Sequence, residues 1–220
     1  MRWFTPFSPL SRLGQMVLLA VIVQLGAVGA QAAPLKILAL GDSLTAGYGL
    51  PAGQGFVPQL EKALKDGGVD ATVLDGGVSG DTTAGGLARL DWALAEDPQV
   101  VIVELGANDA LRGLDPGQAK SNLDAILAKL TAQHRAVLLA GMLAPRNLGA
   151  DYVTAFDAIY PDLAQKYGVG LYPFFLAGVA ADPALNQADG LHPTAAGVAI
   201  IVKGILPALR QVIAKTGAPS

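Results

Sequence analysis

Four short segments of this 220-residue sequence combine glycine with small polar side chains. They are Gly41-Asp42-Ser43, Ser79-Gly80-Asp81, Gly106-Ala107-Asn108-Asp109 and Asp189-Gly190-Leu191-His192. Together they offer a serine hydroxyl, an imidazole with a carboxylate three residues before it, a side-chain amide and glycine backbone N–H groups. These are the parts that acyl transfer needs: a nucleophile, a base with its orienting acid, and donors for a developing oxyanion.

Each of these residues also has an ordinary structural explanation. A Gly-Asp-Ser sequence is a common turn, and Asn108 could simply adopt a turn after a strand. Gly80 could supply a positive φ, and His192, which precedes a proline, could be an extended loop residue. The only other histidine, His134, is expected at the end of a helix, beside its terminal carbonyls. The combination is therefore more informative than any single member.

Strand and helix signals alternate along the chain between these segments. Apolar or β-branched runs predict strands at residues 35–40, 70–74, 100–104, 136–140 and 169–172. Apolar residues at helical spacing predict helices at residues 56–65, 84–95, 118–133, 152–167 and 194–213. In the last two helices we expect Asp151 to cap the fourth, Pro161 to kink or break it, Pro193 to pre-set the first turn of the fifth, and Pro207 to bend it.

The alternation predicts an α/β fold, a three-layer α/β/α arrangement with a mostly parallel, about five-stranded, flavodoxin-like sheet. In such a sheet, ligands bind at the carboxyl ends of the strands. The four polar segments follow strands, so they are expected to converge on one edge of the sheet.

These blocks, in this order, resemble those of the SGNH hydrolases of the GDSL type, in the secreted thioesterase, lysophospholipase and arylesterase subgroup. The resemblance extends from about Leu35 to the final helix. It implies that Ser43 is the nucleophile, and that Asp189 and His192 are the acid and the base. It also implies an oxyanion hole formed by the backbone N–H of Ser43, the backbone N–H of Gly80 and the side-chain amide of Asn108.

The chain departs from the subgroup at one place in these blocks. Where members often have Gly-Gly-Asn-Asp, this chain has Gly106-Ala107-Asn108-Asp109. The additional methyl group leaves the chemistry intact and is expected to tighten the loop beside the oxyanion donor.

The resemblance further implies a small-molecule substrate: a carboxylic ester, an acyl thioester or a lysophospholipid. Loops 110–116 and 143–152 are expected to shape the acyl site, with Arg112 and Arg146 near a polar head group. The candidates for an apolar substrate channel are Leu111, Leu114, Leu143, Leu148 and Tyr152. A carbohydrate O-deacetylase of the same fold is the alternative within the hydrolases.

Two alternatives from other functional classes remain open at this point. Residues 47–52 formally match the dinucleotide-binding pattern G-x-G-x-x-G/A, but the preceding strand ends too far upstream and Pro51 lies inside the match. The second alternative is a non-catalytic binding module on the same fold. Covalent labelling of Ser43 by a fluorophosphonate would separate an enzyme from either.

Composition limits the partners and cofactors. A formal net charge of −3 gives no electrostatic basis for binding nucleic acid. The absence of cysteine excludes disulfides, zinc–thiolate sites and iron–sulfur clusters, and the two histidines are far apart with no H-E-x-x-H sequence. We therefore expect neither a metal nor a cofactor. We also expect the protein to be a monomer.

The first 32 residues have the pattern of a secretory signal peptide. Arg2 and Arg12 precede an apolar run at residues 16–28, which is followed by Ala30-Gln31-Ala32. The run is short for a membrane span, which needs about 20 residues. We expect cleavage after Ala32, a hydrolase domain at residues 33–220 in the periplasm or outside the cell, and no stable membrane insertion afterwards.

Overall fold

The computed structural model describes Met1, Trp3 and residues 33–217 of the chain. The expected signal peptide, residues 1–32, lies outside the described residues except for Met1 and Trp3. Residues Pro34–Ser220 form one compact unit, distinct from Met1–Ala33.

Five parallel strands form a single sheet in the order β2-β1-β3-β4-β5. The strands are β1 (Leu35–Gly41), β2 (Ala71–Gly77), β3 (Val100–Glu104), β4 (Ala136–Ala140) and β5 (Gly170–Tyr172). This order is the flavodoxin-like one, so the predicted fold class is confirmed. The chain runs outward from β1 to β2 and then returns to β3 on the other side of β1. The edge between β1 and β3 is therefore the topological switch point, where ligands bind in such sheets.

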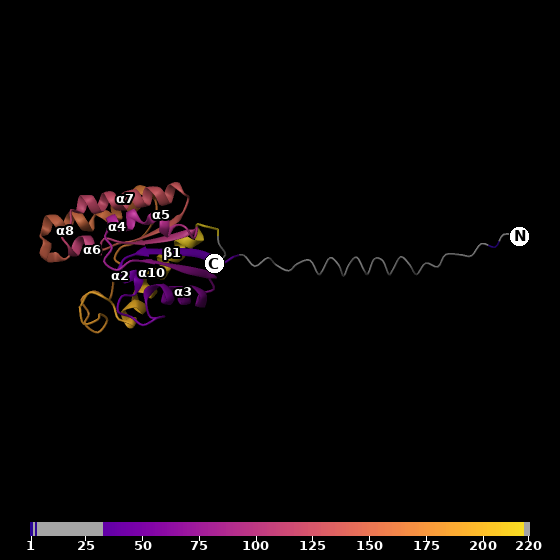
Figure 1. Cartoon of the computed structure of the whole chain (residues 1–220), viewed down its shortest axis with the longest axis horizontal. Helices are drawn as coiled ribbons and strands as arrows, with labels where there is room; N and C mark the ends of the chain where they lie inside the picture. The colour runs from indigo at the N-terminus through magenta and orange to yellow at the C-terminus, as the bar shows by residue number, and fades with distance from the viewer. Residues whose placement is uncertain (2, 4–32, 218–220) are drawn as a thin grey trace. The chain divides into compact units, whose positions relative to one another are not determined.

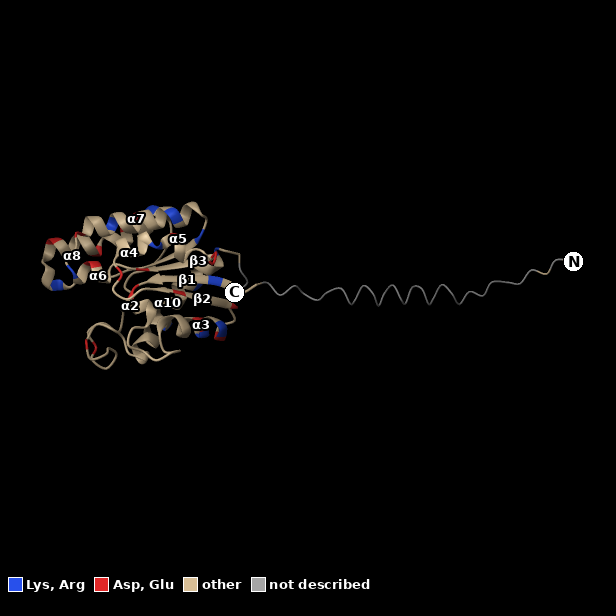
Figure 2. Cartoon of the chain, viewed as in Figure 1, with Lys and Arg blue, Asp and Glu red and all other residues tan. Residues whose placement is uncertain are grey.

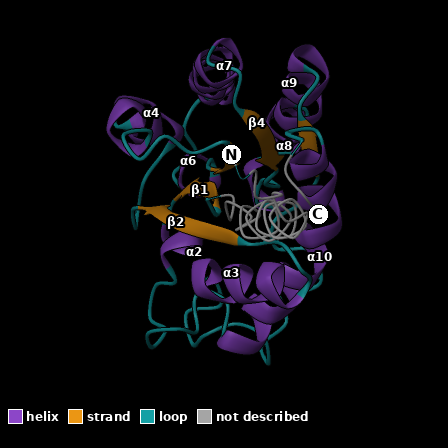
Figure 3. Cartoon of the chain, turned by 90° about the vertical axis from the view of Figure 1, so that its right-hand side faces the viewer, coloured by secondary structure: helices purple, strands orange, loops and turns teal. Residues whose placement is uncertain are grey.

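Helices cover both faces of the sheet (Figure 1, Figure 3). One face carries α3 (Phe56–Asp66) and α10 (Ala195–Ala214), and the other carries α4 (Thr83–Ala88), α7 (Pro116–Ala132) and α9 (Ile159–Tyr167). All five residues of β3 are buried, as expected for a central strand covered on both sides. The strands contain few charges, only Lys36, Asp75 and Glu104 (Figure 2).

The helix predicted at residues 84–95 is two short helices, α4 and α5 (Leu90–Ala93). Gly85 and Gly86 weaken the helix at this point. Arg89, the residue between the two helices, donates through Nε to Asp81 Oδ2 at 2.6 Å and through a terminal nitrogen to the Gly41 carbonyl at 2.8 Å. These tertiary contacts hold the break, and a helical period in the sequence cannot reveal them.

The helix predicted at residues 152–167 is also divided, into α8 (Ala150–Asp157) and α9. The break falls at Ala158, three residues before Pro161, because proline has no N–H to donate to the carbonyl four residues earlier and its ring crowds that carbonyl. Gly149, not Asp151, is the N-terminal cap of α8, and Asp151 lies in its first turn.

The final helix, α10, begins one residue later than predicted. The Thr194 side chain caps it by accepting from the Gly197 N–H at 3.3 Å, so Pro193 precedes the cap instead of forming the first turn. The helix continues through Pro207. It is long and apolar enough to cross a membrane, and its packing against β4, β5 and α3 accounts for that composition.

Two short helices were not predicted, and both begin at the carboxyl ends of central strands. They are α2 (Ser43–Ala46), after β1, and α6 (Ala107–Leu111), after β3. Ala107 therefore opens a helix instead of lying in a loop. A third short element, the 3₁₀ helix η1 (Arg146–Leu148), lies within the predicted acyl-site loop 143–152.

Candidate active site

Ser43 is the first residue of α2, directly beyond the end of β1. Asp42 caps this helix, because its Oδ1 accepts from the Leu44 N–H at 2.9 Å. A Cβ at Gly41 would lie 2.5 Å from Glu104 Oε2 and 2.0 Å from Thr45 Oγ1. Only glycine therefore fits before Asp42 and Ser43, and the tight packing fixes the position at which the serine leaves the sheet.

The imidazole of His192 bridges Ser43 and Asp189. His192 Nε2 lies 2.8 Å from Ser43 Oγ, and His192 Nδ1 lies 2.7 Å from Asp189 Oδ2. The other oxygen of Asp189 accepts from the backbone N–H groups of His192, at 3.0 Å, and Leu191, at 2.9 Å. The structure thus brings the serine, the histidine and the aspartate together, although Ser43 and His192 are 149 residues apart.

Hydrogen bonding to Asp189 also decides which ring nitrogen carries the proton. The backbone N–H of His192, then that of Leu191, then the imidazole lower the pKa of Asp189 to about 2. An ionised carboxylate can only accept. The proton of the neutral imidazole is therefore on Nδ1, and Nε2 is left as an acceptor for the Ser43 hydroxyl.

The three predicted oxyanion donors line one cavity with Ser43 and His192. Within residues 33–217, neither the Ser43 N–H nor the Gly80 N–H donates to a protein acceptor. The Asn108 amide donates to Asp42 Oδ2 at 2.9 Å, which leaves its second N–H without a protein acceptor. Gly80 has a φ of +84°, and Arg112 donates to its carbonyl at 2.8 Å. Arg112 was expected near a head group, and the structure places it as a support for Gly80.

The cavity has a volume of about 770 Å³ and is lined mainly by apolar side chains. Of the five residues predicted for the channel, Leu111 and Leu143 line the cavity, and Leu114, Leu148 and Tyr152 do not. The Tyr152 hydroxyl instead donates to the Leu114 carbonyl at 2.8 Å, and its ring stacks on Phe156. This contact joins loop 110–116 to α8 outside the cavity.

Sequence reasoning did not identify much of the remaining wall. Arg146 lines the cavity and also pairs with Asp157, at 2.6 Å. The unpredicted apolar lining residues include Leu44, Met142, Phe174, Leu176 and Leu191. Part of the signal was present, since the run Phe174-Phe175-Leu176 follows β5 with no strand or helix assigned to it.

Comparison with known proteins agrees with this geometry. Residues 39–200 match the model of the GDSL-like lipase/acylhydrolase family. The chain belongs to this family. The predicted resemblance is confirmed, and the protein is an ester hydrolase.

Individual relatives cover most of the chain. The protein is 42% identical to the "Esterase TesA" of Pseudomonas aeruginosa over 184 residues, which are 83% of this chain and 92% of that one. It is 38% identical to the "Thioesterase 1/protease 1/lysophospholipase L1" of Escherichia coli, over 87% and 85% of the two chains. The crystal structure of AlinE4, an SGNH-hydrolase family esterase, superposes with a TM-score of 0.71 at 46% identity, covering 87% of this chain and all of that one.

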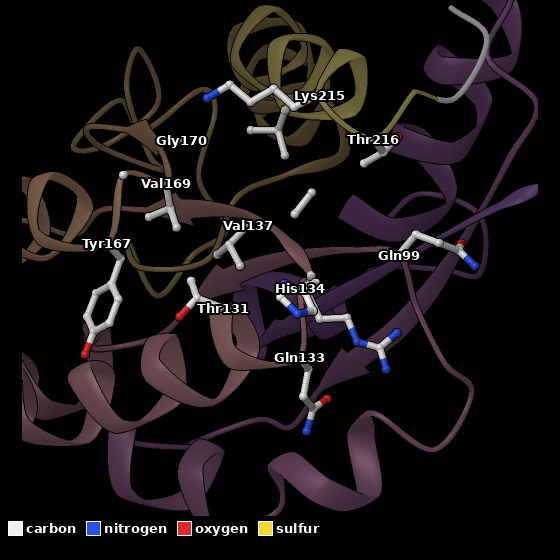
Figure 4. A pocket seen from close by; sticks show the side chains of 14 residues that line it. Gln99, Thr131, Gln133, His134, Val137, Tyr167, Val169, Gly170, Lys215 and Thr216 are labelled. Atoms are coloured by element: carbon white, nitrogen blue, oxygen red, sulfur yellow. The ribbon is translucent and has the colours of Figure 1, made fainter.

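The second histidine of the hydrolase lies away from this site. His134 directly follows the C-terminal cap of α7 and lines a different cavity, of about 610 Å³, at the amino ends of β4 and β5 (Figure 4). Its backbone N–H donates to the Thr131 carbonyl at 2.9 Å, and its φ is +57°. His192 is thus the histidine that the structure places beside Ser43.

Two carboxyl groups lie fully buried beneath the nucleophile of the hydrolase. Asp42 and Glu104 have no exposed surface, and Glu104 Oε2 accepts from the Thr45 hydroxyl at 2.8 Å and from the Asp42 N–H at 3.3 Å. Glu104 Oε1 has no partner. Burial raises the pKa of Asp42 to about 6, and burial together with the negative charge of Asp42 raises the pKa of Glu104 well above its ordinary value. Burial therefore favours the protonated form of Glu104.

The raised pKa of Glu104 predicts how the stability of the fold depends on pH. Its pKa is higher in the folded state than in the unfolded state, so the folded protein binds more protons and becomes less stable as pH rises above about 4.5. Glu104 contributes up to about 1.4 kcal/mol per pH unit to this loss. We expect Glu104→Gln to reduce the slope of unfolding free energy between pH 5 and pH 8, as measured by urea titration.

Neighbouring groups define the control for this measurement. Asp42 titrates in the same direction, and Arg89 and the Tyr160 hydroxyl lie in the same region, but all three remain in the variant. Glu96, an exposed carboxylate paired with Lys36 at 3.4 Å, supplies the control Glu96→Gln, which should keep the wild-type slope. Equal slopes for Glu104→Gln and the wild type would mean that Glu104 is ionised in the folded protein.

Proposed function

We propose that the hydrolase acts through Ser43 as nucleophile, His192 as general base and acid, and Asp189 as the carboxylate that orients the imidazole. The observation that carries this proposal is the pair of hydrogen bonds from Ser43 Oγ to His192 Nε2, at 2.8 Å, and from His192 Nδ1 to Asp189 Oδ2, at 2.7 Å. Ser43 and His192 both line the cavity that also contains Gly80 and Asn108, the two other residues proposed to donate to the oxyanion.

In the first half-reaction, Ser43 Oγ attacks the acyl carbonyl carbon, and His192 Nε2 takes the hydroxyl proton. The carbonyl oxygen becomes an oxyanion, which accepts from the N–H groups of Ser43, Gly80 and Asn108. As the bond to the leaving oxygen or sulfur breaks, the imidazolium gives its proton to that atom. The products are a free alcohol or thiol and an acyl ester on Ser43.

In the second half-reaction, a water molecule takes the place of the leaving group. His192 Nε2 removes a proton from the water as its oxygen attacks the acyl ester, and the same three donors stabilise the second oxyanion. The imidazolium then returns the proton to Ser43 Oγ, and the carboxylic acid leaves. Asp189 stays ionised throughout, because the pKa of its carboxyl group is about 2.

We infer that the preferred substrates carry an apolar acyl chain, as an ester or a thioester. The cavity is lined by leucine, methionine and phenylalanine side chains, so burying the methylene groups of an acyl chain there is energetically favourable. The names of the relatives, an esterase and a thioesterase/lysophospholipase, are consistent with both kinds of leaving group. Arg146 at the cavity wall is the polar group available to a head group.

A substrate panel tests this inference. We expect kcat/KM to rise with acyl length from acetyl to octanoyl p-nitrophenyl esters, by up to about fourfold for each buried methylene until the cavity is filled. Leu111→Ser should flatten this dependence because Leu111 lines the cavity, and Leu114→Ser is the matched control because Leu114 is also exposed but does not line it. Faster deacetylation of acetylated xylo-oligosaccharides than of any longer acyl ester would favour a carbohydrate O-deacetylase instead.

We further propose that residues 1–32 are a cleaved signal peptide, and that residues 33–220 act as a monomer in the periplasm or outside the cell without binding nucleic acid. The support is the order of basic, apolar and small residues in the sequence and the weakly acidic net charge. N-terminal sequencing of the exported protein should begin at Ala33. Recovery of an uncleaved chain from the membrane fraction would overturn this proposal.

A further inference from the structure

The loop that carries Asp189 and His192 is internally braced. Its two sides pair like a short hairpin, because the Thr194 N–H donates to the Leu185 carbonyl at 2.8 Å and the Gln187 N–H donates to the His192 carbonyl at 2.7 Å. Asp189 lies near the tip, where its Oδ1 accepts two backbone N–H groups. The relative positions of Asp189 and His192 are thus set within residues 185–194. This bracing does not place the loop relative to Ser43.

Gln187 joins this loop to the segment that carries the nucleophile. Its side-chain Nε2 donates to the Tyr48 carbonyl at 2.8 Å and to the Pro193 carbonyl at 3.0 Å. Tyr48 follows Gly47, the C-terminal cap of α2, and its ring lies against the imidazole of His192 with the centroids 4.6 Å apart. One amide therefore connects the residue after His192 with the chain five residues after Ser43.

The backbone at residue 49 leaves room for this amide. Gly49 has a φ of +74°, and a Cβ built on it would lie 2.2 Å from Gln187 Oε1. A side chain at residue 49 would thus displace the Gln187 amide from the Tyr48 carbonyl. The contact depends on a glycine in a conformation that other residues rarely adopt.

Within the described residues, only two hydrogen bonds join residues 43–50 to residues 185–194: the Gln187–Tyr48 bond and the Ser43–His192 bond itself. The Ser43–His192 bond cannot serve as a permanent connection, because Ser43 Oγ loses its proton to His192 and becomes acylated during the reaction. The Gln187–Tyr48 bond involves no reacting atom and can persist throughout the cycle.

We propose that Gln187 is a positioning residue of the hydrolase: its amide holds the loop of Asp189 and His192 against the segment after Ser43, and so keeps the imidazole in reach of the serine and of the acyl-enzyme. This inference rests on the proposed role of His192. A displacement of about 1 Å at a reacting group can cost a factor of about 10² in rate. Gln187 acts on the chemical step through His192 and does not contact the acyl chain.

The test replaces Gln187 with methionine, which has a similar length and no N–H donor. We expect kcat for p-nitrophenyl octanoate to fall by about 10- to 100-fold with KM within about twofold of wild type. Gln59→Met is the matched control, because Gln59 Nε2 also bridges two backbone carbonyls, those of Gln54 at 2.7 Å and Ala195 at 3.1 Å. It should change the melting temperature and leave kcat unchanged.

Introducing Gln187→Met into a variant that lacks the imidazole separates a positioning role of Gln187 from a general structural role. In the His192→Ala variant the imidazole is absent, so adding Gln187→Met should cause no further loss of the residual rate. An equal additional loss in that background would overturn the proposal, as would a kcat of Gln187→Met within twofold of wild type or an equal fall in kcat for Gln59→Met. Should Gln187→Met not fold, Gln187→Glu, with the same shape and no donor, replaces it. If neither folds, Gln187 is a folding residue and the proposal is wrong.

The same experiment distinguishes this proposal from the one on which it rests. If His192→Ala retains wild-type activity, His192 is not the base and the proposed mechanism fails. If His192→Ala is inactive and Gln187→Met is fully active, the mechanism stands and only the role of Gln187 is wrong.

Discussion

Replacing Ser43 with alanine is expected to lower kcat for ester hydrolysis by a factor of about 10⁴ or more. The variant loses the attacking oxygen, and no other hydroxyl is hydrogen-bonded to His192 within the described residues. The melting temperature should change little, because within residues 33–217 the Ser43 hydroxyl makes no hydrogen bond except the one to His192. Steady-state kinetics and a melting curve measure both quantities.

A nearby serine supplies the control. Ser79 lines the same cavity, and its hydroxyl has no protein hydrogen-bond partner within residues 33–217, so Ser79→Ala should keep kcat within about threefold of wild type. Activity of Ser43→Ala within tenfold of wild type would contradict the assignment of the nucleophile. The same would follow if Ser79→Ala, and not Ser43→Ala, abolished covalent labelling by a fluorophosphonate.

The three hydrogen-bonded side chains should behave as a unit. We expect His192→Ala to cost about as much as Ser43→Ala, and the double variant to be little worse than either. Asp189→Asn should cost less than His192→Ala or about the same, since the Asp189 side chain meets the imidazole only at Nδ1. Fully multiplicative losses would mean that the residues act independently.

The order and direction of the strands could be predicted because their sequences are simple. The first four residues of Val100–Glu104 are β-branched and the whole strand is buried, and each predicted strand is followed by glycine-containing segments and a helical period. A hydrophobic period is a property of the local sequence, so it can be recognised without knowing which other elements pack against that segment. The break at Arg89 depends on two tertiary hydrogen bonds and the break at Ala158 on a backbone clash, and a helical period in the sequence shows neither.

The lining of the cavity was harder to predict than the residues of the polar blocks. Tyr152 was expected in the channel because it is aromatic and lies in a nearby segment, but α8 turns its ring toward Phe156. Leu111 and Leu114 are equally apolar, and the short helix α6 brings only Leu111 to the cavity. Short helices such as α6 and α8 determine which of these side chains face the cavity. They are too short to be recognised from a hydrophobic period in the sequence.

Glu104 is a functional residue that its position in the sequence already indicates. A carboxylic acid at the end of an otherwise apolar central strand is unusual, since burying a charge is costly. It indicates a buried polar network, here with Asp42 and Thr45 under the nucleophile. Asn108 joins this network through its hydrogen bond to Asp42 Oδ2, and it also lines the cavity. Its replacement is therefore expected to have a large effect on kcat.

Asn108→Ala is expected to lower kcat by a factor of about 10² to 10³ with little change in KM, because the oxyanion that its amide stabilises exists only transiently. Asn108→Asp should be at least as harmful, since a carboxylate would face both Asp42 Oδ2 and the oxyanion. Asn108→Gly should not restore activity. Asn108 lies in α6 with an ordinary negative φ, so glycine supplies nothing that the backbone requires and removes the donor.

Asp42→Asn tests the orientation of that amide without removing it. Asparagine caps a helix as well as aspartate does, so the bond to the Leu44 N–H survives. In the wild-type protein the Asn108 NH₂ group lies 2.9 Å from Asp42 Oδ2. In the variant an NH₂ group replaces Oδ2, so two NH₂ groups face each other. Two donors cannot share a hydrogen bond, so Asn108 must rotate away from its position beside Ser43. We expect kcat to fall by at least about tenfold, less than in Asn108→Ala, and the double variant to resemble Asn108→Ala.

A fully active Asn108→Gly variant with a wild-type melting curve would contradict the role of Asn108 in the oxyanion hole. The Ser43 and Gly80 N–H groups would then be its only donors.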